Sequence, residues 1–303
     1  MVSKAERPVT KINPNREHLS ERSVVKIMHP QRSLPEEPRQ IYFMRHAERV
    51  DLAFGHDWYK MYIDETGYHR RNLNLPRKIP TRRGGPKDFY MDSPITEIGT
   101  FQSRLIGEAL LSKGVVFSEV YTSPAFRCIG TALSVLEGMN MKVPLKLEPS
   151  LFEWMAWSRG TIPNFMLPEE VNDYGIKVDL SYKPVLQSAH LNTTEKSEDF
   201  YERSYHFVKA ALQNIRGSVL MVGHSATLDV CSRQLLGSKP RNAEDLVRVV
   251  QKVPFCGLCV TEETPAGWEL VQAPIPSLIH CQNAGFDWRV LLDEYKPSPF
   301  GRK

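Results

Sequence analysis

The stretch IYFMRHAERVD, residues 41–51, decides the fold, because an apolar run leads directly into a cluster of charged residues. Its first four residues, 41–44, are typical of a short strand buried on both faces of a parallel sheet. Arg45 and His46 follow without a break. Ligands of open parallel sheets bind beyond the carboxyl ends of the strands. The stretch therefore predicts a buried strand that delivers Arg45 and His46 to a binding site.

Strand and helix signals alternate along the rest of the chain. Strands are expected at 117–122 and 219–222, and a late hairpin at 253–260 and 267–272. Helices are expected from Thr96 to Gly114, at 125–136, from Ser197 onward, and at 226–236 before Gly237. This alternation predicts an α/β fold, a three-layer sandwich with a mostly parallel central sheet. The helix after Thr96 is expected to bury one apolar face, made of Ile98, Phe101, Leu105, Ile106, Ala109 and Leu110.

Two segments differ in composition from this alternating pattern. Residues 1–38 contain five prolines and mixed charges but no aromatic residue, which predicts a disordered N-terminal segment. It is interpreted either as a docking arm or as a solvated leader. Residues 52–92 form a polar insertion rich in Arg, Gly and Pro. The expected domain organisation is a disordered segment at 1–38 followed by one domain at 39–303.

Composition and charge exclude several classes of protein. Hydrophobic residues make up 41% of the chain and charged residues 24%, as in ordinary globular proteins. A net charge of +4 is too small for a dedicated nucleic-acid binder, but it suits a cleft that gathers anions. No apolar run has the length of a membrane span, and the first residues do not form a secretory signal. Five scattered cysteines favour free thiols in a reducing, cytoplasmic setting.

Three predicted strands end in residues suited to binding an anion. The first is followed by Arg45 and His46, the second by Ser123 with Arg127 shortly after, and a later one by His224. Because the carboxyl ends of parallel strands share one edge of the sheet, these side chains are expected to face one crevice. Helix N-termini at the same edge would add free backbone N–H groups.

A phosphate monoester explains this combination of side chains. Its dianion needs planar, permanently charged donors, which Arg supplies and Lys does not. Neighbouring guanidinium groups should keep His46 neutral, so that its imidazole can act as a nucleophile near pH 7. Transfer of the phosphoryl group is mainly positioning and charge stabilisation, so neither a metal nor a cofactor is expected. Glu153, flanked by Phe152 and Trp154, is the candidate proton donor, because a carboxyl between aromatic rings is expected to keep its proton.

Several longer motifs resemble a known family. Arg45-His46-Ala47 is similar to the Arg-His-Gly triplet that marks the histidine phosphatase superfamily, also called phosphoglycerate mutase-like. The likeness is greatest to one branch, the Sts (TULA) phosphatases and the insect ecdysteroid-phosphate phosphatases. It rests on residues 45–51, Phe54-Gly55 with Trp58, and residues 72–76, 93–96 and 151–154, and the matching segments span about 40–292.

The resemblance implies a role for each candidate residue. His46 would become the phosphohistidine, and Arg45, Arg49 and Arg127 would hold the phosphate. His224 would bind the phosphate oxygens, and Glu153 would act first as the acid and then as the base that activates water. The resemblance also implies a phosphoglycerate mutase-like fold, phosphotyrosine-like or steroid phosphate esters as substrates, and a homodimer.

Ala47 departs from the family triplet and leaves an alternative open. If position 47 needs a positive φ or a close approach to phosphate, the added methyl group would weaken binding. The alternative is a pseudophosphatase, a dimeric module that binds phosphorylated ligands without hydrolysing them. A phosphoglycerate-type mutase is a less favoured alternative, because it needs a second cluster of anion-binding residues.

Three other features each have two interpretations. Cys256 and Cys259, with His280 and Cys281, suggest zinc, but a separation of three residues in a strand points side chains to opposite faces, so buried thiols are preferred. The basic stretch 82–85 would either gate the crevice or form a solvated turn. The aromatic residues at 54–62 would either line a substrate pocket or form a satellite hydrophobic cluster.

Overall fold

The computed structural model describes residues 38–158, 160–278 and 287–292. The chain divides into two units, Met1–Ser33 and Leu34–Lys303, and every described residue belongs to the second. The predicted disordered segment lies outside the described residues, except for its last residue. His280 and Cys281 lie outside them as well.

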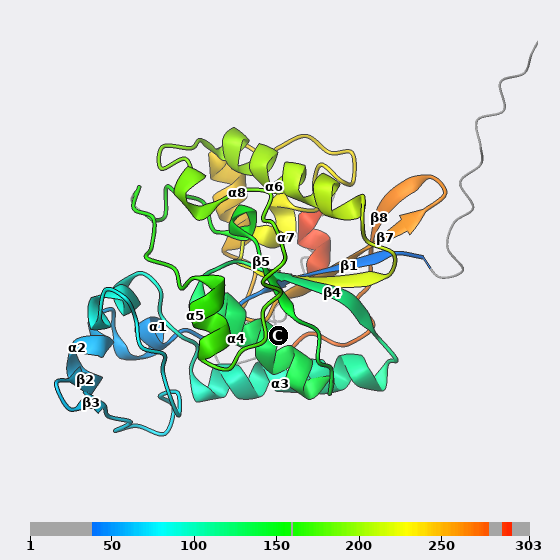
Figure 1. Ribbon diagram of the computed structural model, residues 1–303. Helices are drawn as coiled ribbons and strands as arrows, with labels where there is room; N and C mark the ends of the chain where they lie inside the picture. The colour runs from blue at the N-terminus through cyan, green and yellow to red at the C-terminus, as the bar shows by residue number, and fades with distance from the viewer. Residues whose placement is uncertain (1–37, 159, 279–286, 293–303) are drawn as a thin grey trace, which may run out of the picture. The chain divides into compact units, whose positions relative to one another are not determined.

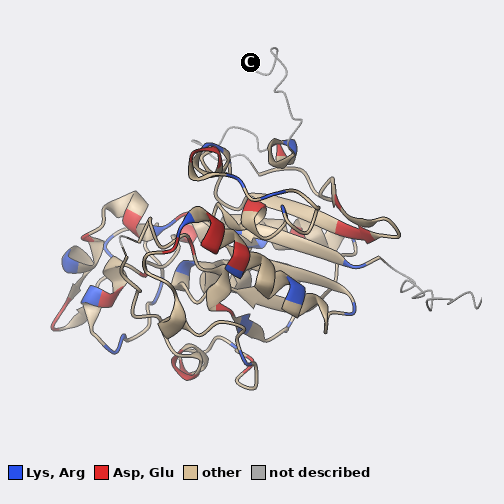
Figure 2. Ribbon diagram, turned by 90° about the horizontal axis from the view of Figure 1, so that it is seen from above, with Lys and Arg blue, Asp and Glu red and all other residues tan. Residues whose placement is uncertain are grey.

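A six-stranded sheet forms the centre of the second unit (Figure 1). Its order is β5-β4-β6-β1-β7-β8. β5, β4, β6 and β1 run parallel to one another, and β7 pairs antiparallel with both β1 and β8. The strands are β1 (Gln40–Arg45), β4 (Phe117–Thr122), β5 (Leu145–Leu147), β6 (Ser218–Gly223), β7 (Leu258–Thr264) and β8 (Gly267–Val271). Figure 2 shows few charged residues on the central strands, as burial of both sheet faces requires. The predicted α/β fold with a mostly parallel sheet is confirmed.

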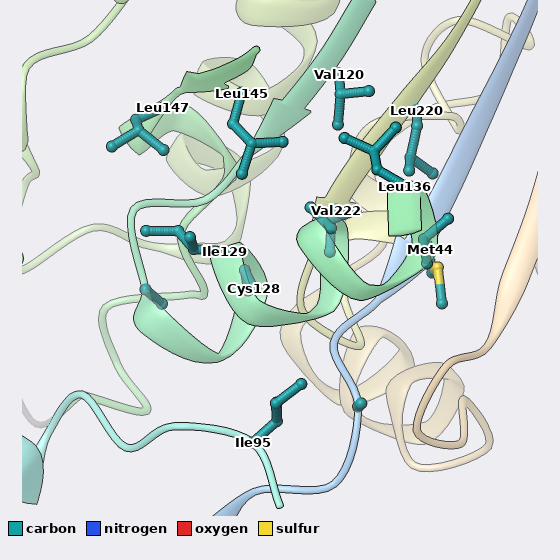
Figure 3. Close-up of a cluster of buried hydrophobic side chains, with 14 of the residues drawn as sticks. Met44, Ile95, Val120, Cys128, Ile129, Leu136, Leu145, Leu147, Leu220 and Val222 are labelled. Atoms are coloured by element: carbon teal, nitrogen blue, oxygen red, sulfur yellow. The ribbon is translucent and has the colours of Figure 1, made fainter. Parts of the chain in front are cut away.

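Helices cover both faces of the sheet (Figure 1). One face carries α3 (Glu97–Ser112) and α4 (Phe126–Gly138), and the other carries α6 (Ser197–Leu212), α7 (Thr227–Val230) and α8 (Ala243–Val250). Successive strand residues alternate between the two cores: Leu220 and Val222 pack toward α4 (Figure 3), whereas Val219 and Met221 join the opposite cluster. The three-layer arrangement is therefore confirmed, and it follows from alternation in strands that are apolar on both faces.

The predicted element boundaries hold to within a few residues, with two differences. The helix expected at 226–236 is regular only to Val230, although single helical bonds continue to Leu236 before Gly237 turns with φ 78°. The first strand of the hairpin begins at Leu258, because Cys256 has a φ of 59° that a strand does not accommodate. α6 begins at Ser197, as expected.

The prediction for the buried face of α3 was partly wrong. Ile106 and Leu110 are buried, but Ile98, Phe101 and Leu105 are exposed, Phe101 by 67%. The helix packs against α4 through small residues, and a Cβ added at Gly107 would lie 2.1 Å from the Val135 carbonyl oxygen. Close helix packing thus selects the face that carries small residues, leaving the larger apolar side chains outside.

The insertion has a small core of its own. It contains α1 (Val50–Phe54), α2 (Trp58–Tyr62), a hairpin of β2 (Ile63–Asp64) and β3 (Gly67–Tyr68), and the 3₁₀ turn η1 (Pro86–Tyr90). Trp58 is fully buried against Phe89, and the neighbouring aromatic residues pack around this pair. The satellite-cluster interpretation of the aromatic residues is therefore the correct one. The remaining elements are the short helix α5 (Pro168–Asp173) and the 3₁₀ turns η2 (Pro149–Leu151), η3 (Ser188–His190) and η4 (Trp288–Leu291).

Candidate active site

The three chemically unusual strand ends lie side by side. β6 is flanked by β4 and β1, so the carboxyl ends of these strands are neighbours. The His46 amide donates to the Gly223 carbonyl at 2.9 Å, and the Ser123 amide donates to the Val222 carbonyl at 2.9 Å. A Cβ at position 223 would lie 2.2 Å from the hydroxyl of Thr227, which accepts a bond from the His224 amide. Glycine at 223 therefore permits the turn that presents His224.

His46 is oriented so that one ring nitrogen stays free. Its Nδ1 lies 2.8 Å from the carbonyl oxygen of Ala47. A carbonyl only accepts, so Nδ1 carries the proton and Nε2 keeps its lone pair. Burial, followed by the charges of Arg127 and Arg45, holds the pKa of His46 well below its ordinary value of 6.5. The ring is therefore neutral at pH 7, as the sequence predicted, with Nε2 available as a nucleophile.

His224 lies beside His46, with the two ring centroids 5.5 Å apart. Its Nδ1 is 3.2 Å from Nη2 of Arg127, and because Arg only donates, this nitrogen must accept. The proton of the neutral ring is then on Nε2, which lies 3.0 Å from the Ser123 hydroxyl. Burial and the charge of Arg127 hold the pKa of His224 well below 6.5. Arg127 thus fixes the tautomer of His224, and the Ser123 hydroxyl accepts from its Nε2.

Two arginines carry buried donors that have no partner among the described residues. The Arg127 side chain is 0% exposed, and its Nε and Nη1 have no acceptor among the described residues. Arg45 donates from Nη1 to the Val253 carbonyl at 2.5 Å, while its Nε is also unpaired within the described part of the chain. Burial and the nearby charge of Arg49 lower the pKa of Arg45 to about 10, so it remains a cation at neutral pH. Buried donors are normally paired, so these are suited to an anion that enters the site.

Arg49 is held by a carboxylate that the sequence analysis did not single out. Its Nε and Nη2 donate to Asp51 at 2.9 and 2.5 Å, a two-point ion pair. The Asp51 side chain is fully buried, and its amide donates to the Ser93 hydroxyl at 3.1 Å. Asp51 therefore orients Arg49, and its place two residues further along the same motif was the available signal.

Glu153 reaches the same cluster from the loop after η2. Its Oε1 accepts from Nη2 of Arg127 at 3.0 Å, and its Oε2 lies 3.6 Å from Nδ1 of His224. The expectation that Phe152 and Trp154 enclose its carboxyl was wrong. Phe152 packs edge-on against His224, and the Trp154 indole donates to the carbonyl of Glu195. Glu153 and Arg49 keep about a fifth of their side chains exposed, at 20% and 19%, so solvent reaches the cluster at these two residues.

The start of α4, which positions Arg127, is capped from the insertion. The Phe126 amide donates to Oδ1 of Asp92 at 2.6 Å, because the capping position holds Ala125, whose side chain cannot accept. Asp92 is buried and pairs with Arg82 at 2.9 Å. Arg82 is thus a structural anchor, which neither interpretation of the basic stretch foresaw, whereas Arg83 is exposed in a turn, as the solvated-turn interpretation expected.

Two more residues at the site had no signal in the sequence. The Phe255 ring lies 4.5 Å from the guanidinium carbon of Arg45 and 5.8 Å from the His46 ring. Cys128 Sγ lies 3.7 Å from Nε2 of His224, and burial raises the pKa of its thiol to about 12, so it stays uncharged. Phe255 is some two hundred residues from Arg45 in sequence, and only the sheet order brings it there.

The two cysteines considered for zinc face opposite cores. Cys256 belongs to the cluster that contains α4, and Cys259 belongs to the cluster that contains α7. Both are buried free thiols.

Among residues 38–158, 160–278 and 287–292, no helix combines the length and apolar character required to cross a membrane.

The methyl group of Ala47 points away from the cluster of cations. It is fully buried with the core residues that face α3 and α4, and it would lie 3.2 Å from a Cβ added at Gly99. Its amide donates to the Thr131 hydroxyl at 2.9 Å, and φ at this position is not positive. The one motive for a pseudophosphatase is therefore absent from the geometry.

Known proteins are similar to this chain in sequence and in structure. The family model of the histidine phosphatase superfamily (branch 1) matches residues 86–274, a range that includes Arg127, Glu153 and His224. A crystal structure of the ecdysone phosphate phosphatase from Bombyx mori, in complex with tungstate, matches with a TM-score of 0.73 and 34% identity, covering 84% of this chain and 100% of that one.

Curated proteins are similar over the same share of the chain. The ecdysteroid-phosphate phosphatase of Drosophila melanogaster is 42% identical over 258 residues, covering 84% of this chain and 34% of that protein. The human ubiquitin-associated and SH3 domain-containing protein B is 37% identical, covering 84% of this chain and 40% of that protein. The chain thus spans well under half the length of these curated relatives.

Proposed function

The chain belongs to the histidine phosphatase superfamily, and we propose that it hydrolyses phosphate monoesters through a phosphohistidine formed on His46. One observation carries the proposal. The free Nε2 of a neutral His46 lies among guanidinium groups of Arg45 and Arg127 whose buried N–H donors have no described acceptor. A phosphate dianion would satisfy those donors and place its phosphorus before the lone pair.

In the first step, His46 Nε2 attacks phosphorus and the ester P–O bond breaks. Arg45, Arg49 and Arg127 hold the three non-bridging oxygens and offset their charge in the transition state. Glu153, at the open side of the cluster, donates a proton to the departing ester oxygen, so that an alcohol leaves. Burial and the positive field keep His224 neutral, and binding of the dianion offsets part of that field. His224 can then take a proton from solvent on Nδ1, donate a hydrogen bond from it to a phosphate oxygen, and return the proton when phosphate leaves.

In the second step, water attacks the phosphohistidine from the side that the alcohol has left. Glu153, now a carboxylate, accepts a proton from this water, and the P–N bond breaks to release phosphate and neutral His46. Each residue returns to its starting state. The cycle uses only groups that the chain itself supplies.

We propose esters of aromatic or steroid alcohols as the substrate class. The relatives named as ecdysteroid-phosphate phosphatases motivate the steroid esters. Phe255, partly exposed beside Arg45 and His46, would offer an apolar wall to such a leaving group. Phosphotyrosine is an ester of an aromatic alcohol, and its ring would pack on the same wall.

The test is hydrolysis of para-nitrophenyl phosphate by the purified chain in the presence of EDTA, beside a His46→Ala variant. EDTA-resistant turnover that disappears in the variant supports the proposal, and acid-labile, base-stable ³²P on the unaltered protein after a rapid quench would identify the phosphohistidine. An unaltered chain that binds vanadate but shows no turnover would overturn it.

We also propose that the protein works as a cytoplasmic homodimer. Free thiols suit a reducing compartment. The exposed apolar side chains of α3, Ile98, Phe101 and Leu105, would be covered by a second copy. Light scattering on a sizing column should give twice the chain mass, and Phe101→Glu should halve it; cell fractionation tests the compartment.

A further inference from the structure

Glu153 differs from the other site residues in how it is supported. Arg45 ends a central strand, Arg127 is in the first turn of α4, and His224 directly follows β6. Glu153 instead lies in an irregular loop, after the short turn η2. A proton donor must be held within hydrogen-bond reach of the leaving oxygen, so something else has to fix this loop.

Arg203, on α6, binds the backbone of that loop. Its Nη1 donates to the carbonyls of Ser150 and Phe152 at 2.8 and 3.0 Å, and its Nη2 donates to the carbonyl of Glu153 at 3.1 Å. The remaining two donors bind Glu195, Nε at 2.9 Å and Nη2 at 2.6 Å. All five N–H groups of the guanidinium are thus used, and three of them hold the segment that carries the acid.

Glu195 completes the contact from the other side. Its carboxylate is 2% exposed, and besides Arg203 it accepts a bond from the Met155 amide at 3.0 Å. Its own carbonyl accepts from the Trp154 indole at 3.1 Å. The two residues therefore fasten the loop immediately before Glu153, at its own carbonyl, and immediately after it.

We infer that Arg203 and Glu195 are positioning residues for the proton donor of this phosphatase, a role that rests on the proposed function of Glu153. They act only through the loop, since neither touches His46 or the arginines of the site in any described contact. The planar fork of Arg203 is essential to this role, because Lys offers one charged nitrogen in place of five donors in a fixed plane.

The experiment compares two substrates that differ in their need for a proton. Phenyl phosphate has a poor leaving group and requires the acid, whereas para-nitrophenyl phosphate has a good one and depends on it little. The comparison uses kcat/KM, which reports formation of the phosphohistidine and not its hydrolysis, the step in which Glu153 acts as the base on either substrate. Glu153→Gln should lower kcat/KM by about 100-fold on the first and by about 5-fold or less on the second. Arg203→Lys should show the same selectivity: its loss on phenyl phosphate should be at least about ten times larger than its loss on para-nitrophenyl phosphate.

Arg39 provides a matched control. It makes an equivalent two-point pair with Glu263 at 2.6 and 2.7 Å, donates to the carbonyls of Leu212 and Ile215, and is similarly buried. It lies away from the catalytic cluster, at the other end of β1. Arg39→Lys should therefore leave the ratio of the two rates unchanged, even if it lowers the melting temperature. A selective loss in this variant would overturn the inference.

The double variant Arg203→Lys with Glu153→Gln separates positioning from a general loss of structure. If Arg203 acts through Glu153, the double variant loses no more on phenyl phosphate than Glu153→Gln alone, within about twofold. Additive losses, or an Arg203→Lys variant equally impaired on both substrates, would overturn the inference. If Arg203→Lys does not fold, Glu195→Gln, which preserves the shape of the side chain, takes its place. An unchanged ratio of its rates on the two substrates would then count against the inference.

The outcome also distinguishes this inference from the function on which it depends. If the unaltered chain turns over neither ester, the proposed function fails and the positioning role fails with it. If the unaltered chain is active and Glu153→Gln is selective but Arg203→Lys is not, the function stands and only the positioning role is lost.

Discussion

Replacing Ala47 by Gly restores the family triplet and tests whether the methyl group obstructs phosphate. The methyl is fully buried and faces α3 at Gly99, not the cations. Removing it loses about 0.8 kcal/mol of burial. Glycine also adds about 0.5–1 kcal/mol of backbone entropy to the unfolded chain. The free energy of unfolding should therefore fall by about 1.5 kcal/mol, while kcat/KM stays within about twofold, less than 0.5 kcal/mol in the barrier.

Urea denaturation and hydrolysis of para-nitrophenyl phosphate, measured on the same preparations, check both parts. The midpoint of unfolding should fall with an unchanged m-value, because the amount of surface exposed on unfolding is the same. A rise in kcat/KM of tenfold or more, with unchanged stability, would refute the reasoning. It would mean that the methyl group lies against the substrate and that Ala47 weakens turnover.

Three further predictions concern the site and the packing beneath it. Arg127→Lys should lower kcat/KM by about 10²- to 10⁴-fold, because it loses two charge-assisted hydrogen bonds of about 1.5–3 kcal/mol each. A loss below about fivefold on para-nitrophenyl phosphate would contradict this. The unfolded chain takes up protons on His46 and His224 below about pH 6.5, and the folded chain, with both pKa values well below 6.5, does not, so stability rises with pH in this window. Between pH 7.5 and 5.5 the two histidines should lower the free energy of unfolding, measured by urea denaturation, by about 2–3 kcal/mol. The His46→Gln variant should show about half of this pH dependence, and an unchanged dependence would argue against the reasoning. Gly107→Ala places a methyl 2.1 Å from a carbonyl oxygen of α4 and should destabilise the fold by about 1–3 kcal/mol, whereas Gly130→Ala, where the nearest atom is a side-chain carbon at 3.3 Å, should melt close to the unaltered chain.

The central strands and the residues at their ends were predictable from local sequence. An apolar run of four residues is long enough to identify β1 and β6, and Arg45, His46 and His224 follow these runs directly. The convergence of these residues needed only the rule that parallel strands present their carboxyl ends at one edge. The position of Glu153 came from resemblance, because nothing in the local pattern separates it from a surface carboxylate.

Predictions of side-chain burial were wrong where burial depends on which surfaces of the elements pack together. Periodicity placed Phe101 and Leu105 inside, but α3 turned its small residues toward α4, since only these allow the helices to approach closely. The expected enclosure of the Glu153 carboxyl by rings failed for the same reason. The directions of neighbouring side chains in a loop depend on which backbone groups are hydrogen-bonded, and the backbone of this loop is bound by Arg203 of α6.

The sequence by itself determined the α/β class, the order of its elements, and the histidines and arginines that a phosphate ester requires, because these depend on short-range periodicity and on the chemistry of single residues. Tertiary structure alone decided that Phe255 lies on Arg45, that Asp92 caps the helix of Arg127, and that Arg203 holds the loop of Glu153. Each of these contacts joins segments far apart in the chain. Their partners are selected by packing and by the need to pair buried polar groups, neither of which leaves a periodic trace in the sequence.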